Sequence, residues 1–397
     1  MQYMIVGVVG KPNCGKSTFF KACTLMDVEI ANYPFATIKP NHGIGFVRVP
    51  CADAFFKVQC NPREGYCINH IRFVPVNIID VAGLVPGAHE GKGMGNQFLD
   101  DLRQADVLIH VIDISGGTNE KGEPIPPGSY DPAEDIRFLE IELDMWYLQI
   151  IKRGWEKFAR QIVQEHLQVE KALAKQLSGL GVTENMVKDT LRKLNLNNEK
   201  PDLWLDSDLA SIARELRRIT KPMLIAANKI DVFDANLERI KREFPEYMIV
   251  GCSAASELAL KEGRKKGLVD YIPGEKSFKI VGQINDRQKA GLDFIREVME
   301  RFDGTGVQKV LDNAVFEILK YIAVFPGGVS KLEDQYGRVL PDCFLMPPGT
   351  TALDFAYKLH TDFGKNFIKA IDVKTRMPVG KEHKLKMGDV IEIYSGK

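Results

Sequence analysis

A glycine-rich motif close to the first residue has the residue types and spacing of a phosphate-binding loop. Residues 10–17 read Gly-Lys-Pro-Asn-Cys-Gly-Lys-Ser and fit the pattern G-x-x-x-x-G-K-[ST], between an apolar run and a helical segment. Glycines let successive backbone N–H groups turn toward a β-phosphate, and the helix that follows adds its positive N-terminal end. Lys16 can neutralise charge on the β- and γ-phosphates, and Ser17 can bind Mg²⁺. The residues predicted to hold the nucleotide here are Asn13, Cys14, Gly15, Lys16, Ser17 and Thr18.

A second element, Asp80-Val81-Ala82-Gly83, directly follows an apolar run at 76–79. An aspartate at the end of a strand can hold Mg²⁺ through water, and the N–H of Gly83 can reach a γ-phosphate. The pattern D-x-x-G alone says little. Its place at a strand end, downstream of a phosphate-binding loop, makes Asp80 a candidate metal ligand and Gly83 a candidate catalytic residue.

The third and fourth elements suit recognition of a guanine base. Asn228-Lys229-Ile230-Asp231 follows a predicted strand, and the Asp231 carboxylate can accept hydrogen bonds from guanine N1–H and the exocyclic amine. Adenine lacks that donor pair and would leave the carboxylate unsatisfied. Lys229 can lie along the base, Asn228 can brace the phosphate loop, and Ser253-Ala254-Ala255 can offer the Ala254 N–H to guanine O6. Four motifs in this order predict a GTP-binding domain that uses Mg²⁺.

The elements that must position these motifs are strands of an α/β fold. Near-continuous apolar runs are typical of strands buried on both faces of a mostly parallel sheet. Between the second and third motifs the apolar residues recur at helical spacing, and only Gly154 interrupts this pattern from Ala133 to Leu177. The sheet pattern resumes at residue 222, so a helical hairpin is inserted into the α/β domain. The predicted strands are Met4–Val9, Gly43–Val49, Phe73–Ile79, Val107–Ile112, 222–227 and 247–250.

Changes in the residue pattern along the chain predict four structural segments. Glycines and prolines crowd residues 114–132 and mark a boundary, and from residue 323 short strands, turns and a helix near 352–360 indicate a small α+β domain. The predicted boundaries are 1–132 for the first part of the nucleotide domain, 133–220 for the insertion, 221–322 for the second part with flanking helices, and 323–397 for the final domain.

Composition excludes several classes of protein. The 397 residues carry 53 basic and 53 acidic side chains, so a globally basic coat for nucleic acid is excluded. No apolar run reaches the length of roughly 18–20 residues that a bilayer requires, and the N-terminus reads as a strand rather than a signal peptide. Seven cysteines in a chain of this length indicate reduced thiols and a cytoplasmic protein with no membrane partner.

A cysteine and histidine cluster leaves two interpretations open. Cys51, Cys60, Cys67 and His70 follow the pattern C-x₈-C-x₆-C-x₂-H, and four such ligands within 20 residues could hold zinc. The spacing lacks the tight C-x₂-C knuckle of common structural sites, which favours buried free thiols instead. Metal analysis of the purified protein distinguishes the two.

A modestly basic stretch also has two interpretations. Residues 261–289 hold eight basic and four acidic side chains. They form either a solvated face or a surface for the phosphates of RNA. The basic residues are Lys261, Arg264, Lys265, Lys266, Lys276, Lys279, Arg287 and Lys289.

Over essentially its whole length the chain resembles the Obg/YchF-type translation-factor GTPases. Residues 10–17, 32–41 and 80–88 look like the family's P-loop, switch I and switch II, and the insertion resembles that of the YchF branch. Segments at 340–342, 346–351 and 360–363 resemble a TGS domain, a ubiquitin-like module. The resemblance implies an α/β P-loop G-domain with a mostly parallel sheet, an inserted helical hairpin and a C-terminal α+β TGS domain.

The resemblance also implies roles for individual residues. Thr37 corresponds to the switch I threonine that closes over Mg²⁺ and the γ-phosphate, and Lys16, Thr37, Gly83 and His89 form the expected catalytic set, although His89 is equally well read as a surface residue. Leu84 stands where Ras-like enzymes carry a water-orienting glutamine, and leucine cannot bond water. Asn13 matches a position that helps related GTPases bind K⁺, whose charge replaces an arginine finger.

Three functional alternatives remain at this stage. The first is a switch that hydrolyses GTP slowly, for which the family suggests the ribosome or RNA as partner, and we expect it to be a monomer. Many YchF proteins have glutamate at the position of Asp231 and prefer ATP, so an ATP-preferring hydrolase is one alternative. A nucleotide-stabilised RNA-binding module with little hydrolysis is the other. A metabolic P-loop kinase is disfavoured, because the chain carries the Asn-Lys-x-Asp element and no visible second substrate site.

Overall fold

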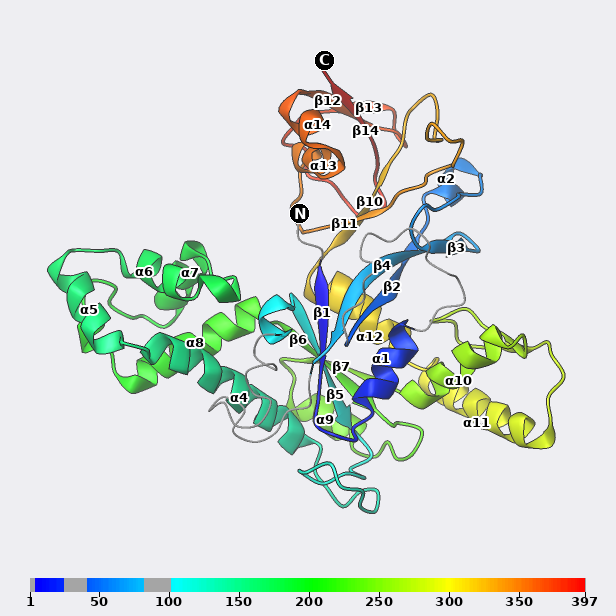
Figure 1. Ribbon diagram of the computed structural model, residues 1–397, viewed down its shortest axis with the longest axis horizontal. Helices are drawn as coiled ribbons and strands as arrows, with labels where there is room; N and C mark the ends of the chain where they lie inside the picture. Colours follow the sequence, from blue (N-terminus) through cyan, green and yellow to red (C-terminus); the bar gives the residue numbers. More distant parts are fainter. Residues whose placement is uncertain (1–3, 25–40, 82–100, 397) are drawn as a thin grey trace. The chain divides into compact units, whose positions relative to one another are not determined.

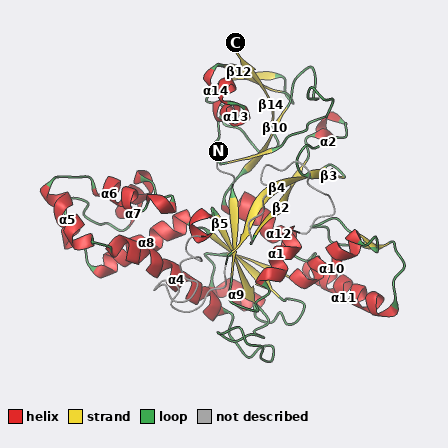
Figure 2. Ribbon diagram, viewed as in Figure 1, coloured by secondary structure: helices red, strands yellow, loops and turns green. Residues whose placement is uncertain are grey.

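The computed structural model describes residues 4–24, 41–81 and 101–396. They belong to two compact units, which are described separately. The P-loop unit comprises Ile5–Ser17 and Ile79–Cys252, and the C-terminal unit comprises mainly Thr18–Ile78 and Ser253–Lys397. Figure 1 follows the chain through its elements, and Figure 2 distinguishes helices from strands.

Four parallel strands make the sheet of the P-loop unit, in the order β1-β5-β6-β7. Every residue of β5 and β6 is buried, which confirms the apolar runs predicted to be interior strands. Because the strands are parallel, their carboxyl ends share one edge, where Asp113 and Asn228 are in register. The strands are β1 (Ile5–Val9), β5 (Val107–Asp113), β6 (Met223–Asn228) and β7 (Met248–Cys252), and α9 (Leu237–Glu243) lies between the last two in sequence.

The helical insertion between β5 and β6 contains five helices (Figure 1). The helical pattern expected from Ala133 to Leu177 breaks at Gly154, as predicted, where φ is +77°. It breaks a second time near His166, whose φ is +52°, so the stretch forms three helices. The helices are α4 (Ala133–Lys152), α5 (Trp155–Gln164), α6 (Val169–Gln176), α7 (Glu184–Lys193) and α8 (Asp206–Thr220), with short 3₁₀ turns at Ser178–Leu180 and Pro201–Leu203.

Helices α4 and α8 are joined by a buried guanidinium. The Arg217 side chain is only 1% exposed, and its Nε donates to Asp144 Oδ1 at 2.8 Å. Its Nη2 lies 3.4 Å from Glu140 Oε1, so both of its carboxylate partners come from α4. A buried cation needs such partners, because its removal from water is costly.

A buried lysine fastens the end of the insertion to the sheet. The Lys221 ammonium donates to the carbonyl oxygens of Arg103 at 3.0 Å and Ala105 at 2.6 Å. Burial lowers the pKa of Lys221 to about 8. Lys221, which precedes β6, is therefore held against the residues that precede β5.

Three strands open the C-terminal unit. Strands β3 and β4 form an antiparallel hairpin, and β2 lies beside β4. Helix α12 contacts β2, because the Gln308 amide donates to the Phe46 carbonyl at 2.7 Å. The elements of this part are α1 (Lys16–Thr24), β2 (His42–Pro50), α2 (Asp53–Phe56), β3 (Tyr66–Ile68), β4 (Ile71–Asp80), α10 (Ala254–Lys265), β8 (Val269–Asp270), β9 (Lys279–Ile280), α11 (Asp286–Phe302) and α12 (Val307–Asn313), followed by a π-helical turn at Ala314–Ile318.

The final segment folds as an α+β domain, in agreement with the sequence. Its five-stranded sheet has the order β11-β10-β14-β12-β13, in which β10 and β14 are parallel. Phe355 of α13 lies in an apolar core with Val324, Ala370 and Ile391 of the sheet. The elements are β10 (Ile322–Pro326), β11 (Phe344–Met346), α13 (Ala352–Leu359), α14 (Thr361–Lys365), β12 (Phe367–Asp372), β13 (Met377–Val379) and β14 (Val390–Ser395).

Among the described helices, none combines the length and the apolar character that a membrane span requires.

The α4–α8 contact yields a test of the insertion. Replacing Arg217 with alanine leaves the carboxylates of Asp144 and Glu140 without their buried partner. We expect the insertion to lose about 3 kcal/mol of stability, the low end for a broken buried pair, because both carboxylates keep some exposure. All three tryptophans of the chain lie in the insertion, so urea unfolding followed by tryptophan fluorescence measures the change.

The matched control is Arg214→Ala. Arg214 also contacts Asp144, at 3.2 Å, but its side chain is 57% exposed. Its loss should cost less than about 1 kcal/mol. Equal effects of the two substitutions would contradict a special role for the buried guanidinium.

Candidate functional site

The phosphate-binding loop connects β1 to α1 at the carboxyl edge of the parallel sheet. Gly15 has a φ of +94°, in the region that favours glycine. A Cβ atom at this position would lie 2.2 Å from Nδ2 of Asn228, so no side chain fits. The loop and the third motif are in contact because residue 15 is a glycine.

Asn228 and Lys229 both hold the phosphate-binding loop through its carbonyl oxygens. The Asn228 amide donates to the Cys14 carbonyl at 3.0 Å, and the Lys229 ammonium donates to the Asn13 carbonyl at 2.8 Å. Lys229 has a φ of +66°, the left-handed conformation. The end of β6 thus places the base motif directly on the loop.

Sequence reasoning missed the residue that holds Lys229. Asp113, at the end of β5, is fully buried, and its Oδ2 lies 2.8 Å from the Lys229 ammonium. The same carboxylate accepts from the hydroxyls of Ser115 at 2.5 Å and Thr118 at 3.0 Å. These bonds offset the cost of burying a carboxylate. The position of Asp113 at the end of a buried parallel strand was the feature of the sequence that could have identified it.

The candidate phosphate and metal residues lie together. The Lys16 ammonium forms an ion pair with Asp80, and the Ser17 hydroxyl is 3.4 Å from Asp80 Oδ2. Hydroxyl and carboxylate oxygens are the ligands that Mg²⁺ prefers. The oxygens of Ser17 and Asp80 therefore fit a magnesium ion, and the neighbouring ammonium fits a phosphate.

A second lysine connects the phosphate-binding loop to the insertion, and it too was missed from the sequence. The buried Lys11 ammonium donates to the Thr118 carbonyl at 2.9 Å and pairs with Asp135 of α4 at 3.0 Å. It also lies 3.8 Å from the centre of the Tyr130 ring, whose hydroxyl donates to Asp135. Burial raises the pKa of Asp135 to about 6, although the Lys11 charge opposes the rise.

The remaining predicted nucleotide residues have simpler surroundings. The Asn13 amide donates to the Gly122 carbonyl at 2.9 Å, and burial raises the pKa of the Cys14 thiol to about 12, so that thiol is inert. Asp231 follows Ile230, whose N–H donates to the Cys252 carbonyl at 3.4 Å.

The remaining predicted residues either belong to the C-terminal unit or lie outside the described residues. Ala254 and Ala255 begin α10 in the C-terminal unit, the Ser253 hydroxyl caps that helix, and Thr18 belongs to the same unit. The predicted positions of Thr37, Gly83, Leu84 and His89 lie outside the described residues.

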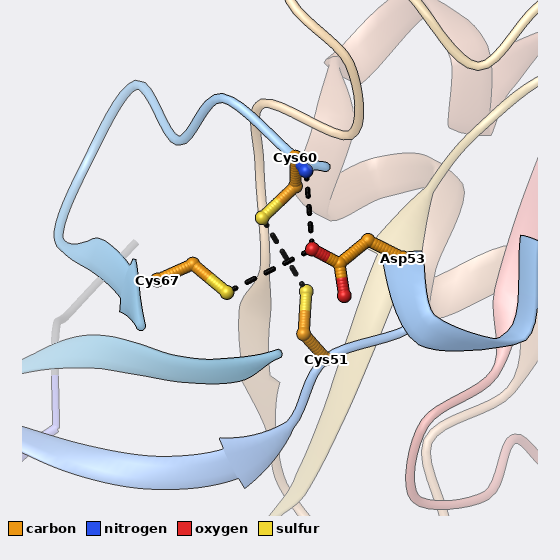
Figure 3. Close-up of side chains that lie close together, drawn as sticks. All are labelled: Cys51, Asp53, Cys60 and Cys67. Atoms are coloured by element: carbon orange, nitrogen blue, oxygen red, sulfur yellow. Dashed lines mark hydrogen bonds between the residues drawn. The ribbon is translucent and has the colours of Figure 1, made fainter. Parts of the chain in front are cut away.

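The structure corrects the predicted cysteine and histidine set. Cys51, Cys60 and Cys67 lie together, but the fourth group beside them is the carboxylate of Asp53 (Figure 3). His70 instead bonds the other carboxylate oxygen through Nδ1, at 2.9 Å. Hydrogen bonds from the Cys60 and Cys67 thiols hold the pKa of Cys51 far below its usual value.

The basic stretch at 261–289 is less exposed than its composition suggested. Lys261 is buried and donates to the Ala22 carbonyl at 2.6 Å, and Arg264 donates to the Tyr271 carbonyl at 2.7 Å. Lys261 and Arg264 are therefore engaged within the protein, whichever of the two interpretations holds for the rest of the stretch. The exposed basic side chains are Lys265, Lys266, Lys276, Lys279, Arg287 and Lys289.

Comparison with known families matches three parts of the chain. Residues 5–137 match a family described as 50S ribosome-binding GTPase. Residues 226–328 match the G4 motif-containing domain of the Obg-like GTPases described as YGR210-like. Residues 336–395 match the TGS domain.

Known proteins are similar over nearly the full length. An uncharacterized GTP-binding protein of Methanocaldococcus jannaschii is 47% identical over 98% of this chain and 99% of its own. The crystal structure of a GTP-binding protein from Pyrococcus horikoshii is 39% identical, covers 99% of this chain and 100% of its own, and has a TM-score of 0.79. The ribosome-binding ATPase YchF of Escherichia coli O157:H7 is 28% identical over 92% of this chain and 86% of its own. The chain therefore belongs to the YchF-like Obg family of P-loop GTP-binding proteins with a C-terminal TGS domain.

Proposed function

We propose that the protein binds GTP with Mg²⁺, hydrolyses it slowly, and signals its nucleotide state through the helical insertion. The contact of Asn228 and Lys229 with the carbonyl oxygens of Cys14 and Asn13 carries the proposal. It fixes the base motif against the phosphate-binding loop, so base and phosphate are recognised by one rigid element. The family to which the chain belongs supports the same function.

Base selection rests on Asp231. In the proposed complex its carboxylate accepts two hydrogen bonds from guanine, and Lys229 lies along the base while Asp113 holds its ammonium. Hydrogen bonds to a charged group are each worth about 1.5–3 kcal/mol. The YchF relative of Escherichia coli carries the name ATPase, so ATP is the competing ligand to measure.

Phosphate binding and metal binding rest on Lys16, Ser17 and Asp80. In the proposed complex the Lys16 ammonium leaves Asp80 and binds the β- and γ-phosphates. The Asp80 carboxylate is then free to bind Mg²⁺ through a water molecule. Ser17 supplies a hydroxyl ligand to the same ion. Mg²⁺ neutralises charge on the phosphate oxygens in this class of site. Thr37, Gly83 and His89 complete the proposed catalytic set.

The Lys11–Asp135 pair supports a route from the nucleotide to the insertion. Lys11 belongs to the phosphate-binding loop, and Asp135 lies in the first turn of α4. A change in the conformation of the loop would therefore alter a contact with the first helix of the insertion. The proposed partner is a ribosome or another RNA, in keeping with the ribosome-binding names of related proteins. The remaining exposed basic side chains at 265–289 are candidates for that contact.

Base selection is tested by substituting Asp231 with asparagine. The asparagine amide offers a donor where guanine also offers donors, so we expect GTP affinity to fall roughly 100-fold or more. Xanthosine triphosphate carries an acceptor at that position and should bind the variant better than GTP does. Dissociation constants for the GTP, ATP and xanthosine triphosphate complexes of both proteins measure the effect. Tighter binding of ATP than GTP by the unaltered protein would contradict the assignment.

Hydrolysis is tested by turnover with Mg²⁺ in K⁺ and in Na⁺, with and without ribosomes. If Asn13 helps to hold K⁺, turnover should be faster in K⁺, and Asn13→Ala should remove the difference. Equal rates in the two salts would rule out the potassium hypothesis. An absence of hydrolysis under every condition would instead favour a nucleotide-stabilised binding module.

The route into the insertion is tested with Asp135→Asn. All three tryptophans lie in the insertion, so GTP binding should change their fluorescence in the unaltered protein. The variant keeps the shape of the side chain but loses its charge, and the change at saturating GTP should shrink severalfold. Glu134→Gln, at an exposed neighbouring carboxylate, is the control. An undiminished response in Asp135→Asn would contradict this route.

The same signal should depend on pH. Because the pKa of Asp135 is raised to about 6, the carboxyl group is charged above pH 6 and neutral below it. The fluorescence change should weaken as pH falls through 6 in the unaltered protein only. Protonation of a carboxyl group with a raised pKa favours the folded state between about pH 6 and 4, so unfolding at this group does not explain the loss.

A further inference from the structure

Three segments of the C-terminal unit bring four ligand atoms to one point. Cys51 follows β2, Asp53 begins α2, Cys60 lies in the next loop and Cys67 belongs to β3. Figure 3 shows the three sulfur atoms and the carboxylate turned toward one another. All four ligand atoms lie within 4.8 Å of each other.

The separations match the edges of a zinc tetrahedron. With Zn–S bonds of about 2.3 Å and Zn–O bonds of about 2.0–2.2 Å, two sulfur ligands stand about 3.8 Å apart, and a sulfur and an oxygen about 3.6 Å. The sulfur atoms of Cys51 and Cys60 are 3.6 Å apart, and Cys67 Sγ lies 3.8 Å from Asp53 Oδ2. These distances exceed the S–S bond of about 2.05 Å that a disulfide requires.

The polar surroundings also suit a cation. The Asp53 side chain is 0% exposed, although buried carboxylates are costly without a compensating charge. One of its oxygens accepts the Cys60 N–H at 3.0 Å, and the other is 2.9 Å from His70 Nδ1. A carboxylate ligand is commonly oriented by such outer hydrogen bonds. Cysteines that merely fill an apolar core have no reason to surround a buried carboxylate.

A buried arginine balances the charge of the cluster. Arg72 is 0% exposed, and its guanidinium donates to the carbonyl oxygens of Leu340 at 2.6 Å and Pro341 at 3.4 Å. It interacts with the sulfur atoms of Cys51 and Cys60, and in the described part of the chain no carboxylate forms an ion pair with it. Three thiolates and a carboxylate around a divalent ion leave a net negative charge, which Arg72 partly offsets.

We propose that Cys51, Asp53, Cys60 and Cys67 bind one structural zinc ion, oriented by His70 outside the ligand set. Thiolate-rich tetrahedral sites select zinc among the common divalent ions, and four protein ligands close the site to chemistry. The ion links the loop after α2 to the end of β2 and to β3.

The linked loop contacts the TGS segment. Asn61 N–H donates to the Val339 carbonyl and Arg63 N–H to the Pro341 carbonyl, both at 2.9 Å. The Arg63 guanidinium also pairs with Asp342 at 2.8 Å. Zinc would therefore fix the loop that holds the TGS segment from residue 339 to 342.

The test begins with the full chain purified under reducing conditions without chelator. We expect one zinc per chain by mass spectrometry, and in the cobalt-exchanged protein the absorption of thiolate-to-cobalt charge transfer. A strong chelator should expose three further thiols to a thiol reagent and increase amide hydrogen exchange at residues 57–65. These measurements use the unaltered chain, so they do not depend on a variant that folds.

Substitutions then identify the ligands. Cys60→Ser and Asp53→Ala should lose the zinc, Asp53→Cys should keep it, and Cys23→Ala, at a buried thiol outside the cluster, should keep one equivalent. His70→Ala should retain the ion with affinity reduced about 10- to 100-fold. Complete loss in His70→Ala, with retention in Asp53→Ala, would overturn the ligand set.

Other outcomes would overturn the site itself. They are a chain that binds neither zinc nor cobalt at one equivalent, iron in place of zinc, or a Cys51–Cys60 disulfide in the purified protein. Nucleotide affinity is measured in parallel. Failure of GTP binding with the zinc retained would count against the proposed function and leave the metal site standing.

Discussion

The nucleotide site depends on one close contact, between the amide of Asn228 and the backbone around Gly15. The amide nitrogen lies 2.2 Å from the point where a Cβ atom at position 15 would be, and it donates to the neighbouring carbonyl of Cys14. A loop that binds phosphate and a strand end that binds a base are separated by more than 200 residues in sequence. This contact makes them one surface, and it tolerates no side chain at position 15.

Two lysines, of which Lys11 is buried and Lys229 is partly exposed, extend that contact in different directions. Lys229 bridges the loop to Asp113 at the end of β5, and Lys11 bridges it to Asp135 at the start of α4. Each ammonium is bonded to a backbone carbonyl and to a carboxylate with little or no exposure. Because such charges are expensive to bury alone, each pair is retained only while the loop keeps its conformation. The loop is thereby connected to the sheet on one side and to the insertion on the other.

Local patterns in the sequence predicted the strands, the helical character of the insertion and the α+β domain near the C-terminus. They succeeded because apolar periodicity and glycine spacing depend on neighbouring residues. The patterns did not identify residues whose contact partner is distant in sequence and whose own residue type belongs to no motif. Asp113 and Asp135 carry no motif, and their roles follow only from the lysines that the fold brings to them.

The cysteine cluster and the basic stretch show the same limit. The sequence offered His70 as the fourth candidate ligand of a possible zinc site, whereas the turn at α2 presents Asp53 to the sulfur atoms. Charge counting placed Lys261 on a surface, yet its ammonium is buried against the Ala22 carbonyl. Composition gives the number of charged side chains in a segment, but it does not show which of them point to solvent.

Contacts hold the insertion near both of its ends. Asp135, in the first turn of α4, pairs with the phosphate-binding loop, and Lys221, just after α8, bonds the carbonyl oxygens before β5. These contacts hold the chain where it leaves the sheet and where it returns to it. A helix of 20 residues is about 30 Å long, so α4 would act as a lever arm for any rotation at its first turn. A displacement of a fraction of an ångström at the loop would become several times larger at the far end, and the distance travelled there would increase with the length of that arm.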